Sequence, residues 1–134
     1  MDLAIRIYSF GYQRSGIPAD STENNGGFVF DCRCLPNPGR DEKYRSLTGL
    51  DTPVQAYLKR YAVVQIFAES CAILVQLSID NYLERKFTNL MVSFGCTGGQ
   101  HRSVYQAELL RMYLKTQEGI SLQVVHTEQP QWPK

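Results

Sequence analysis

The chain has 134 residues, of which 43% are hydrophobic and 20% charged, and its formal net charge is +1. This length predicts one domain with an ordinary core, and a near-neutral charge argues against broad nucleic-acid binding, which needs a basic excess. No apolar run approaches the roughly 20 residues that cross a bilayer, and Arg6 interrupts the first apolar stretch. A cytoplasmic protein is expected.

The first half of the chain predicts two strands and a helical region. Alternating apolar residues indicate a strand over residues 3–9, followed by a turn-rich loop as far as Gly27. A second strand is predicted over residues 28–34, where a Pro-rich segment ends it. Apolar residues then recur at helical spacing over residues 53–80, which form either one bent helix or two.

The second half predicts a strand–turn–helix unit and a last strand. Residues 90–94 are a buried strand, residues 102–115 have helical spacing, and residues 120–124 alternate as a strand. Residues 1–127 are expected to form the domain, and residues 128–134 a poorly ordered tail. Strands separated by helices favour an α/β fold, a single compact domain whose mixed or mainly parallel sheet is flanked by helices.

A Gly-rich turn joins the buried strand to the following helix. Such a junction gathers free backbone N–H groups and the positive end of a helix dipole around one point. Gly98 and Gly99 allow the backbone to approach a ligand closely, and Arg102 adds a planar charged group that can bind two phosphate oxygens. The loop therefore predicts a phosphate or another oxyanion as ligand.

The same loop has the Cys-x5-Arg-Ser spacing of phosphatases. In that interpretation Cys96 attacks phosphorus and Arg102, followed by Ser103, stabilises the equatorial oxygens. A general acid is also needed, and Asp31 and Asp51 are only nominal candidates. Phosphate binding without chemistry and a structural turn are the alternatives. The P-loop pattern Gly-x4-Gly-Lys-Ser/Thr is absent from the sequence, which argues against an ATP or GTP site.

Other polar residues have two interpretations each. His101 either donates to the anion or binds nearby backbone, and Asn37 either contacts ligand or caps its own turn. Asp31 and Arg33 either form a cross-strand ion pair or take part in ligand binding. His126 is expected to be a surface residue at a strand end.

The cysteines are expected to be reduced thiols, because their spacing is not that of a zinc ribbon. No metal and no cofactor is expected. The four are Cys32, Cys34, Cys71 and Cys96.

Four blocks of the sequence resemble a known family. They are residues 9–12 with 16–18, residues 30–38, residues 47–51 and residues 95–104. In this order they are similar to the carboxy-terminal domain of the bacterial RNase adapter protein RapZ. The resemblance implies a stand-alone α/β domain that senses glucosamine-6-phosphate. In full-length members it also implies presentation of a small regulatory RNA to an endoribonuclease.

The resemblance also implies a set of ligand-binding residues. They are Cys96, Thr97, Gly98, Gly99, His101, Arg102 and Ser103 in the loop, with Arg33 and Asn37 from the second block. Three departures limit this transfer. The family's amino-terminal kinase-like P-loop domain has no counterpart here, Gly39 stands where the family often has His, and residues 128–133 replace a basic segment implicated in RNA binding.

The leading hypothesis is a regulatory domain that binds a phosphorylated amino sugar or a similar small anion without turning it over. A Cys-dependent phosphatase is the alternative, and an RNA-binding adapter is a third hypothesis. RNA or a regulatory protein is a candidate partner. The identity of the sugar and the oligomeric state are left open.

Overall fold

Four parallel strands form the centre of the molecule. The computed structural model describes residues 2–134. The strands are β1 (Leu3–Gly11), β2 (Phe28–Asp31), β3 (Asn89–Cys96) and β4 (Ile120–His126). They lie in the order β2-β3-β1-β4, and each neighbouring pair is parallel. The predicted α/β fold class is confirmed, and the sheet is of the parallel type.

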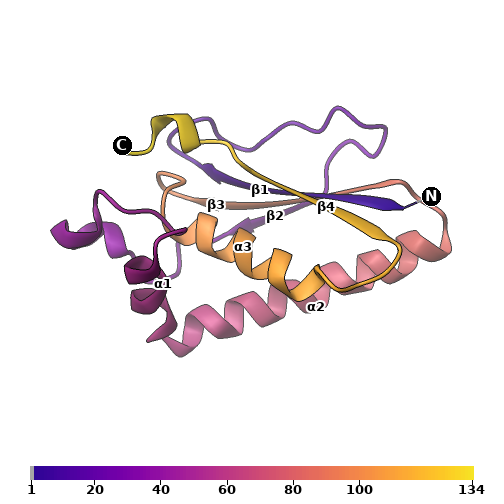
Figure 1. Ribbon diagram of the computed structural model, residues 1–134. Coiled ribbons are helices and arrows are strands. Elements are labelled where there is room, and N and C mark those ends of the chain that lie inside the picture. The colour runs from indigo at the N-terminus through magenta and orange to yellow at the C-terminus, as the bar shows by residue number, and fades with distance from the viewer. Residues whose placement is uncertain (1) are drawn as a thin grey trace.

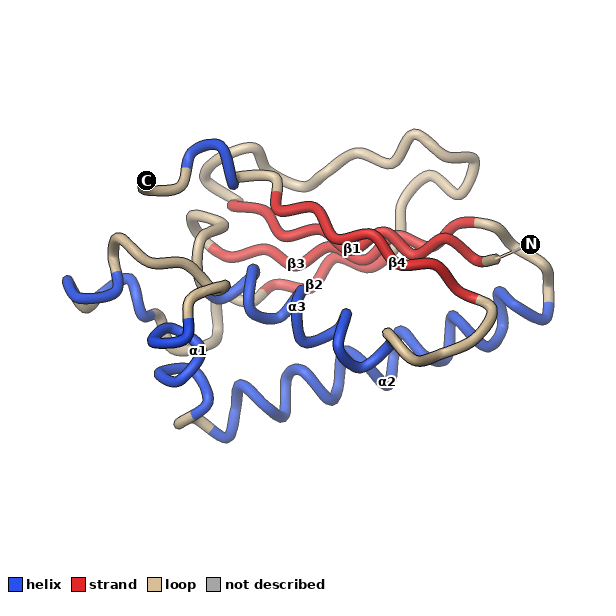
Figure 2. The backbone as a smooth tube through the Cα atoms, viewed as in Figure 1, coloured by secondary structure: helices blue, strands red, loops and turns tan. Residues whose placement is uncertain are grey.

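Helices cover one face of this sheet. α1 (Thr52–Lys59) and α2 (Ala62–Glu84) follow β2, and α3 (Arg102–Leu114) follows β3. In Figures 1 and 2, α2 and α3 run along the lower face, whereas the long loop between β1 and β2 and the C-terminal segment lie above the sheet. Three short 3-10 helices complete the fold: η1 (Pro38–Arg40), η2 (Glu42–Tyr44) and η3 (Gln129–Gln131).

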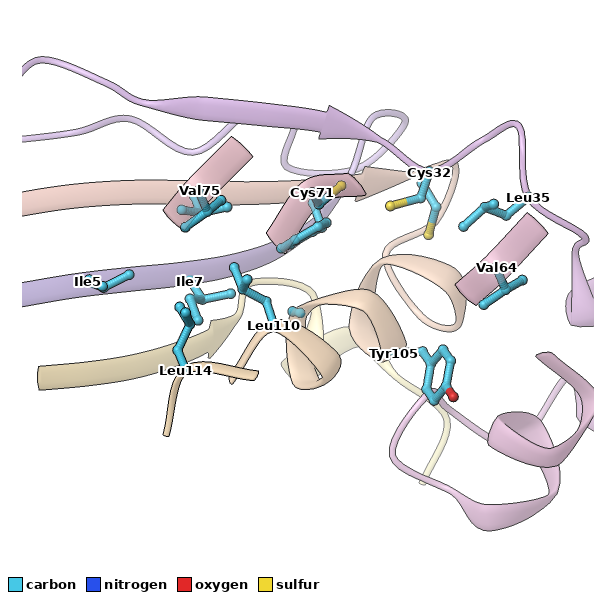
Figure 3. Packing of buried hydrophobic residues seen from close by; sticks show 14 of the residues in the cluster. Ile5, Ile7, Cys32, Leu35, Val64, Cys71, Val75, Tyr105, Leu110 and Leu114 are labelled. Carbon is cyan, nitrogen blue, oxygen red and sulfur yellow. The ribbon is translucent and has the colours of Figure 1, made fainter. Parts of the chain in front are cut away.

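The core lies between the sheet and the helices. Leu3, Ile5 and Ile7 on β1 are buried, while the residues between them are partly exposed. This alternation places one side of the strand against the helices. Figure 3 shows Ile5 and Ile7 beside Leu110 and Leu114, which come from α3.

On the opposite face, one buried carboxylate organises the loop of residues 12–27. The Asp20 side chain is 1% exposed, and it accepts hydrogen bonds from Arg6 Nη2 at 2.7 Å, Gly26 N at 2.8 Å and Thr22 N at 2.9 Å. Burial alone would raise the pKa of Asp20, but these hydrogen bonds hold the pKa well below its usual range. Asp20 therefore stays ionised and fixes the loop on β1.

The structure settles one helix boundary and changes the end of one predicted strand. α1 and α2 are separate helices, because the backbone of Tyr61 between them is extended. The second strand ends at Asp31 instead of continuing to residue 34. The reason is local: the Asp31 carboxylate accepts the backbone N–H of Arg33 at 2.9 Å, which turns the chain out of the sheet.

The expectation that no apolar run reaches membrane-spanning length is wrong for α2. This helix has 23 residues, and an 18-residue stretch of it has a mean hydropathy of 1.8. Scattered polar residues such as Gln65, Glu69 and Gln76 interrupt the apolar sequence, but the mean hydropathy of the stretch stays high. By length and composition α2 could cross a bilayer, yet one side of it, including Val75 and Ile79, is buried in the core.

The C-terminal residues also differ from the expected poorly ordered tail. Glu128 is 2% exposed, and η3 follows it directly. The indole Nε1 of Trp132 donates a hydrogen bond to the Gly99 carbonyl at 3.0 Å. Sequence composition suggested disorder, but these long-range contacts hold the segment against the loop that follows β3.

Candidate functional site

A small cavity lies where the predicted anion loop meets the ends of the strands. Its volume is about 190 Å³. The loop that follows β3 and the segment that follows β2 both contribute, so the cavity lies at the carboxyl ends of the strands, where α/β sheets usually bind ligands. The lining residues are Asn37, Gly39, Cys96, Thr97, Gly98, Gln100, His101 and Arg102.

The backbone N–H groups of the loop have no acceptor inside the protein. Within residues 2–134, no hydrogen bond uses the N–H of any residue from Thr97 to Ser103. Several of these residues are buried, including Gly99 and His101, and buried N–H groups without partners are rare in folded proteins. Gly99 has φ +71°. Successive N–H groups around such a residue form an anion-binding concavity.

Neighbouring segments bind the carbonyl groups of the same loop. The N–H groups of Tyr12 and Gln13 donate to the carbonyls of Cys96 and Thr97 at 2.8 and 3.1 Å. Because a peptide C=O and N–H point in opposite directions, fixing the carbonyls outward leaves the N–H groups available on the other side. The loop is therefore held in one orientation by groups outside the cavity.

Arg102 is held at the cavity by backbone carbonyls. It is 6% exposed, and its Nη1 donates to the carbonyls of Arg33 and Leu35 at 3.0 and 3.1 Å. Its Nη2 lies 3.5 Å from the Thr97 hydroxyl. A guanidinium has five N–H donors, so these contacts leave donors for a ligand. The charge has no carboxylate partner among residues 2–134, which suits an external anion.

His101 is neutral and oriented. Its Nε2 lies 2.9 Å from the carbonyl of Tyr44, so Nε2 carries the proton and Nδ1 is an acceptor. Burial lowers the pKa of His101, and the hydrogen bond to Tyr44 only partly opposes this effect. The Cε1–Nδ1 edge faces Gly39, where an added Cβ would lie 3.6 Å from both atoms.

The Cys96 thiol lines the cavity and contacts Ser103. The Sγ atom is 3.1 Å from the Ser103 hydroxyl, and Cys96 is 3% exposed. All four cysteines carry free thiols. Neither nominal general acid lines the cavity: Asp31 pairs with Arg33, and Asp51 accepts the N–H of Thr48 at 2.7 Å.

The two residues expected from the second block have different positions. Asn37 lines the cavity, and its Oδ1 also accepts the N–H of Gly39 at 3.0 Å, so both interpretations of Asn37 fit the geometry. The Arg33 side chain does not line the cavity. It forms an ion pair with Asp31 at 2.8 Å and stacks 3.9 Å above the Tyr12 ring. The pair is two residues apart in one turn and is not the cross-strand pair expected.

A family model described as the RapZ C-terminal domain matches residues 3–130. The chain belongs to this family. Relatives include proteins named nucleotide-binding protein from Thioalkalivibrio sulfidiphilus, with 42% identity over 126 residues, and from Thermotoga sp. (strain RQ2), with 41% identity over 125 residues. These matches cover 94% and 93% of this chain but 42% of each relative, so the chain spans less than half their length.

The cavity of this RapZ C-terminal domain includes residues that the sequence analysis missed. Gly39 and Gln100 line it but were not predicted as site residues. The Gln100 side chain donates to the carbonyls of Arg45 and Leu47, both at 2.8 Å, and the N–H of Gly49 donates to the Gln100 carbonyl. The block at residues 47–51 therefore supports the loop, a role that no local pattern reveals.

The expectation that His126 is a surface residue is wrong. Its side chain is 7% exposed, and its Nδ1 and Nε2 lie 2.6 Å from Ser9 Oγ and 2.8 Å from Glu108 Oε2. Ser9 is fully buried, so no substrate reaches its hydroxyl. This cluster joins β1, β4 and α3 behind the loop and has a structural role.

Larger hollows lack the chemistry of the small cavity. One of about 640 Å³ lies between residues 21–24 and 86–89, and another of about 650 Å³ lies near η1 and η2. The first is open and has Lys86 and Glu23 in its lining, and the second combines arginines with acidic residues. Neither combines unpaired N–H groups with a buried cation. Among residues 2–134 no cluster of His, Cys, Asp and Glu could hold a metal ion.

Proposed function

We propose that this domain is a regulatory sensor that binds a phosphorylated amino sugar, by family resemblance glucosamine-6-phosphate, without turning it over. The observation that carries the proposal is the run of N–H groups from Thr97 to Ser103 without internal acceptors, beside the buried guanidinium of Arg102. Backbone N–H groups, a helix N-terminus and an arginine together bind phosphate.

The other lining groups suit a polar organic part on the anion. A cavity of about 190 Å³ is smaller than the roughly 300 Å³ at which sites for drug-sized ligands begin, so the ligand is small. Neutral His101 offers an acceptor at Nδ1 and Asn37 an amide, both on the side of the cavity next to η1. A sugar hydroxyl or ammonium group can donate to such acceptors.

Calorimetric titration of the same protein with glucosamine-6-phosphate, glucose-6-phosphate and inorganic phosphate tests the proposal. We expect all three to bind at one site and the amino sugar to bind most tightly. Equal affinity for all three would reduce the proposal to a phosphate site. No heat change with any of them, at concentrations up to the millimolar range typical of weak ligands, would refute it.

A Cys-dependent phosphatase is the second candidate. The contact between Cys96 and the Ser103 hydroxyl favours it, because a hydroxyl there can donate to a thiolate nucleophile. The absence of a carboxyl group from the cavity lining argues against it. Incubation with aryl phosphates separates the two ideas, since turnover that disappears in Cys96→Ser would replace the sensor proposal with the enzyme.

Partners and location are part of the same proposal. We place the protein in the cytoplasm, where sugar phosphates occur, with RNA or a regulatory protein as the partner that reads the bound state. A salt-dependent gel shift with structured RNA tests the RNA role, and absence of binding at low salt rejects it. The nucleotide-binding property in the relatives' names is not transferred, because the P-loop pattern is absent from these 134 residues.

A further inference from the structure

The C-terminal segment supplies an internal anion directly behind the anion loop. The Glu128 carboxylate accepts the N–H groups of Gly11 and Ser15, both at 3.0 Å, and the Ser15 hydroxyl at 2.9 Å. Glu128 is 2% exposed, and within residues 2–134 it forms no ion pair. Two backbone N–H groups and a hydroxyl therefore hold this carboxylate without a cation, and it ties the segment after β4 to the end of β1.

Gly99 packs against the side chain of Glu128. A Cβ at Gly99 would lie 2.5 Å from Glu128 Cγ and 2.7 Å from the nitrogen of Gly11. A Cβ at Gly11 would in turn lie 2.6 Å from the carbonyl carbon of Gly98. Such distances leave no room for a side chain at either glycine, so the loop backbone packs directly against the Glu128 side chain and the Gly11 backbone.

Trp132 fixes the Gly99 peptide from the same side. Its Nε1 donates to the Gly99 carbonyl at 3.0 Å, and its ring lies 5.6 Å from that of His126. His126 is itself held by Ser9 and Glu108. The indole is therefore anchored to β4 and, through His126, to β1 and α3.

This hydrogen bond determines which way the next N–H group points. The carbonyl of Gly99 and the N–H of Gln100 belong to one planar peptide and point in opposite directions. Because the carbonyl points to Trp132, the N–H of Gln100 points away from the tail. Gln100 lines the cavity, and its N–H has no acceptor within residues 2–134.

We propose that Glu128 and Trp132 are positioning residues of the anion site: they hold the Gly99 peptide in the orientation that directs the loop N–H groups into the cavity. The inference rests on the proposed function, since it concerns how the same loop binds an anion. Neither residue touches the ligand. Their loss lowers the fraction of molecules with a competent loop, and the apparent Kd rises by the reciprocal of that fraction.

Two substitutions and a matched control separate positioning from general stability. Trp132→Phe keeps the ring packing and removes the one donor, so we expect phosphate to bind about fivefold more weakly, the loss of a single hydrogen bond. Glu128→Gln removes the charge and replaces one acceptor oxygen by an NH2 donor, and we expect a loss of about tenfold. Gln131→Ala is the control, because Gln131 is exposed in the 3-10 helix between Glu128 and Trp132 and its side chain makes no hydrogen bond within residues 2–134.

The experiment measures binding of inorganic phosphate and of glucosamine-6-phosphate by calorimetry, with circular dichroism as the check on folding. Trp132 is the only tryptophan, so its emission reports the loop directly, and we expect it to change on titration with the calorimetric Kd. Backbone NMR resonances of residues 98–101 are expected to shift in Trp132→Phe but not in Gln131→Ala, which tests the loop without any ligand.

The outcomes distinguish the positioning role of Glu128 and Trp132 from the proposed anion binding. If both variants bind phosphate as tightly as the unaltered protein, and Trp132 fluorescence does not change on titration, the positioning role is overturned and the proposed function stands. If the unaltered protein binds neither probe, the proposed function fails and the inference fails with it. If Trp132→Phe does not fold, Glu128→Gln and the emission of Trp132 in the unaltered protein still decide.

Discussion

Two clusters of backbone N–H groups lie side by side at the ends of the strands, and they are treated differently. The cluster at Gly11 and Ser15 is filled by the carboxylate of Glu128, at 3.0 Å from each nitrogen. The cluster from Thr97 to Ser103 has no acceptor within residues 2–134. The protein thus carries an internal anion where the fold needs one and leaves the neighbouring donors for an external anion.

The contrast shows how a binding site can be told from a structural turn. Buried N–H groups without partners destabilise a fold by roughly 1–3 kcal/mol each, so folded proteins normally provide them with acceptors. Asp20 does so for Thr22 and Gly26, as Glu128 does for its cluster. Donors that are left unfilled beside a buried arginine are the ones that indicate a ligand.

The largest expected effect is on an internally filled cluster. Asp20→Asn removes a buried carboxylate that pairs with Arg6 and accepts two backbone N–H groups, and we expect the free energy of unfolding to fall by about 3 kcal/mol. Urea denaturation at neutral pH measures this loss. Anion affinity should be unchanged, because Asp20 pairs with Arg6 within β1 and does not line the cavity. A large loss of affinity would contradict the distinction between the two clusters.

The contribution of Asp20 to stability depends on pH. The pKa of Asp20 is held below its ordinary value, so its contribution to stability is complete above about pH 3.9 and is lost as the pH falls toward the folded-state pKa. The difference between the unaltered protein and Asp20→Asn should therefore shrink in acid.

Arg102→Lys tests the unfilled cluster. Lysine keeps the charge but loses the planar fork that reaches the two carbonyls and the cavity at once. We expect phosphate to bind about 30-fold more weakly, roughly 2 kcal/mol, by calorimetry. Arg111→Lys on the same helix is the matched control, since Arg111 pairs with Glu108 at the surface. Equal affinities of Arg102→Lys and Arg111→Lys for phosphate would contradict a role of Arg102 in anion binding.

Gly98→Ala separates ligand contact from folding. A Cβ at Gly98 would meet no atom within 4 Å, whereas Gly99 has φ +71° and lies against Glu128. We expect Gly98→Ala to change the stability by less than about 0.5 kcal/mol but to weaken phosphate binding about tenfold, because the added methyl occupies the approach of the anion. Gly99→Ala should lose both stability and binding. Thermal melts and calorimetry on both variants check this.

The smallest expected effect concerns His101. Burial lowers its pKa, so at about pH 8 the ring is neutral and at about pH 5.5 a bound anion favours the imidazolium. Sulfate, whose charge does not change over this range, should bind about threefold more tightly at the lower pH. The ligand-free protein should instead lose stability as the pH falls, because the unfolded state takes up the proton first. A His101→Gln variant that keeps the same pH slope would disprove the assignment.

The sequence was most informative where structure is local. The apolar strand, the two glycines and the helical spacing after Arg102 follow one another within residues 90–115, and the structure places β3, the loop and α3 there. Contacts across long separations were not predictable: Trp132 reaches Gly99, and Glu128 reaches Gly11, 117 residues away. A Gln- and Pro-containing tail has the composition of a disordered segment, and only the three-dimensional structure reveals its donors and acceptors.

The placement of the two ends of the chain has a practical consequence. In Figure 1 the amino end and the C-terminal end lie at opposite ends of the sheet, and the C-terminal end is beside the loop that follows β3. An affinity tag or a fluorescent fusion attached after Lys134 would begin three residues after Trp132, whose indole holds Gly99. Fusions for ligand assays therefore belong at the amino end.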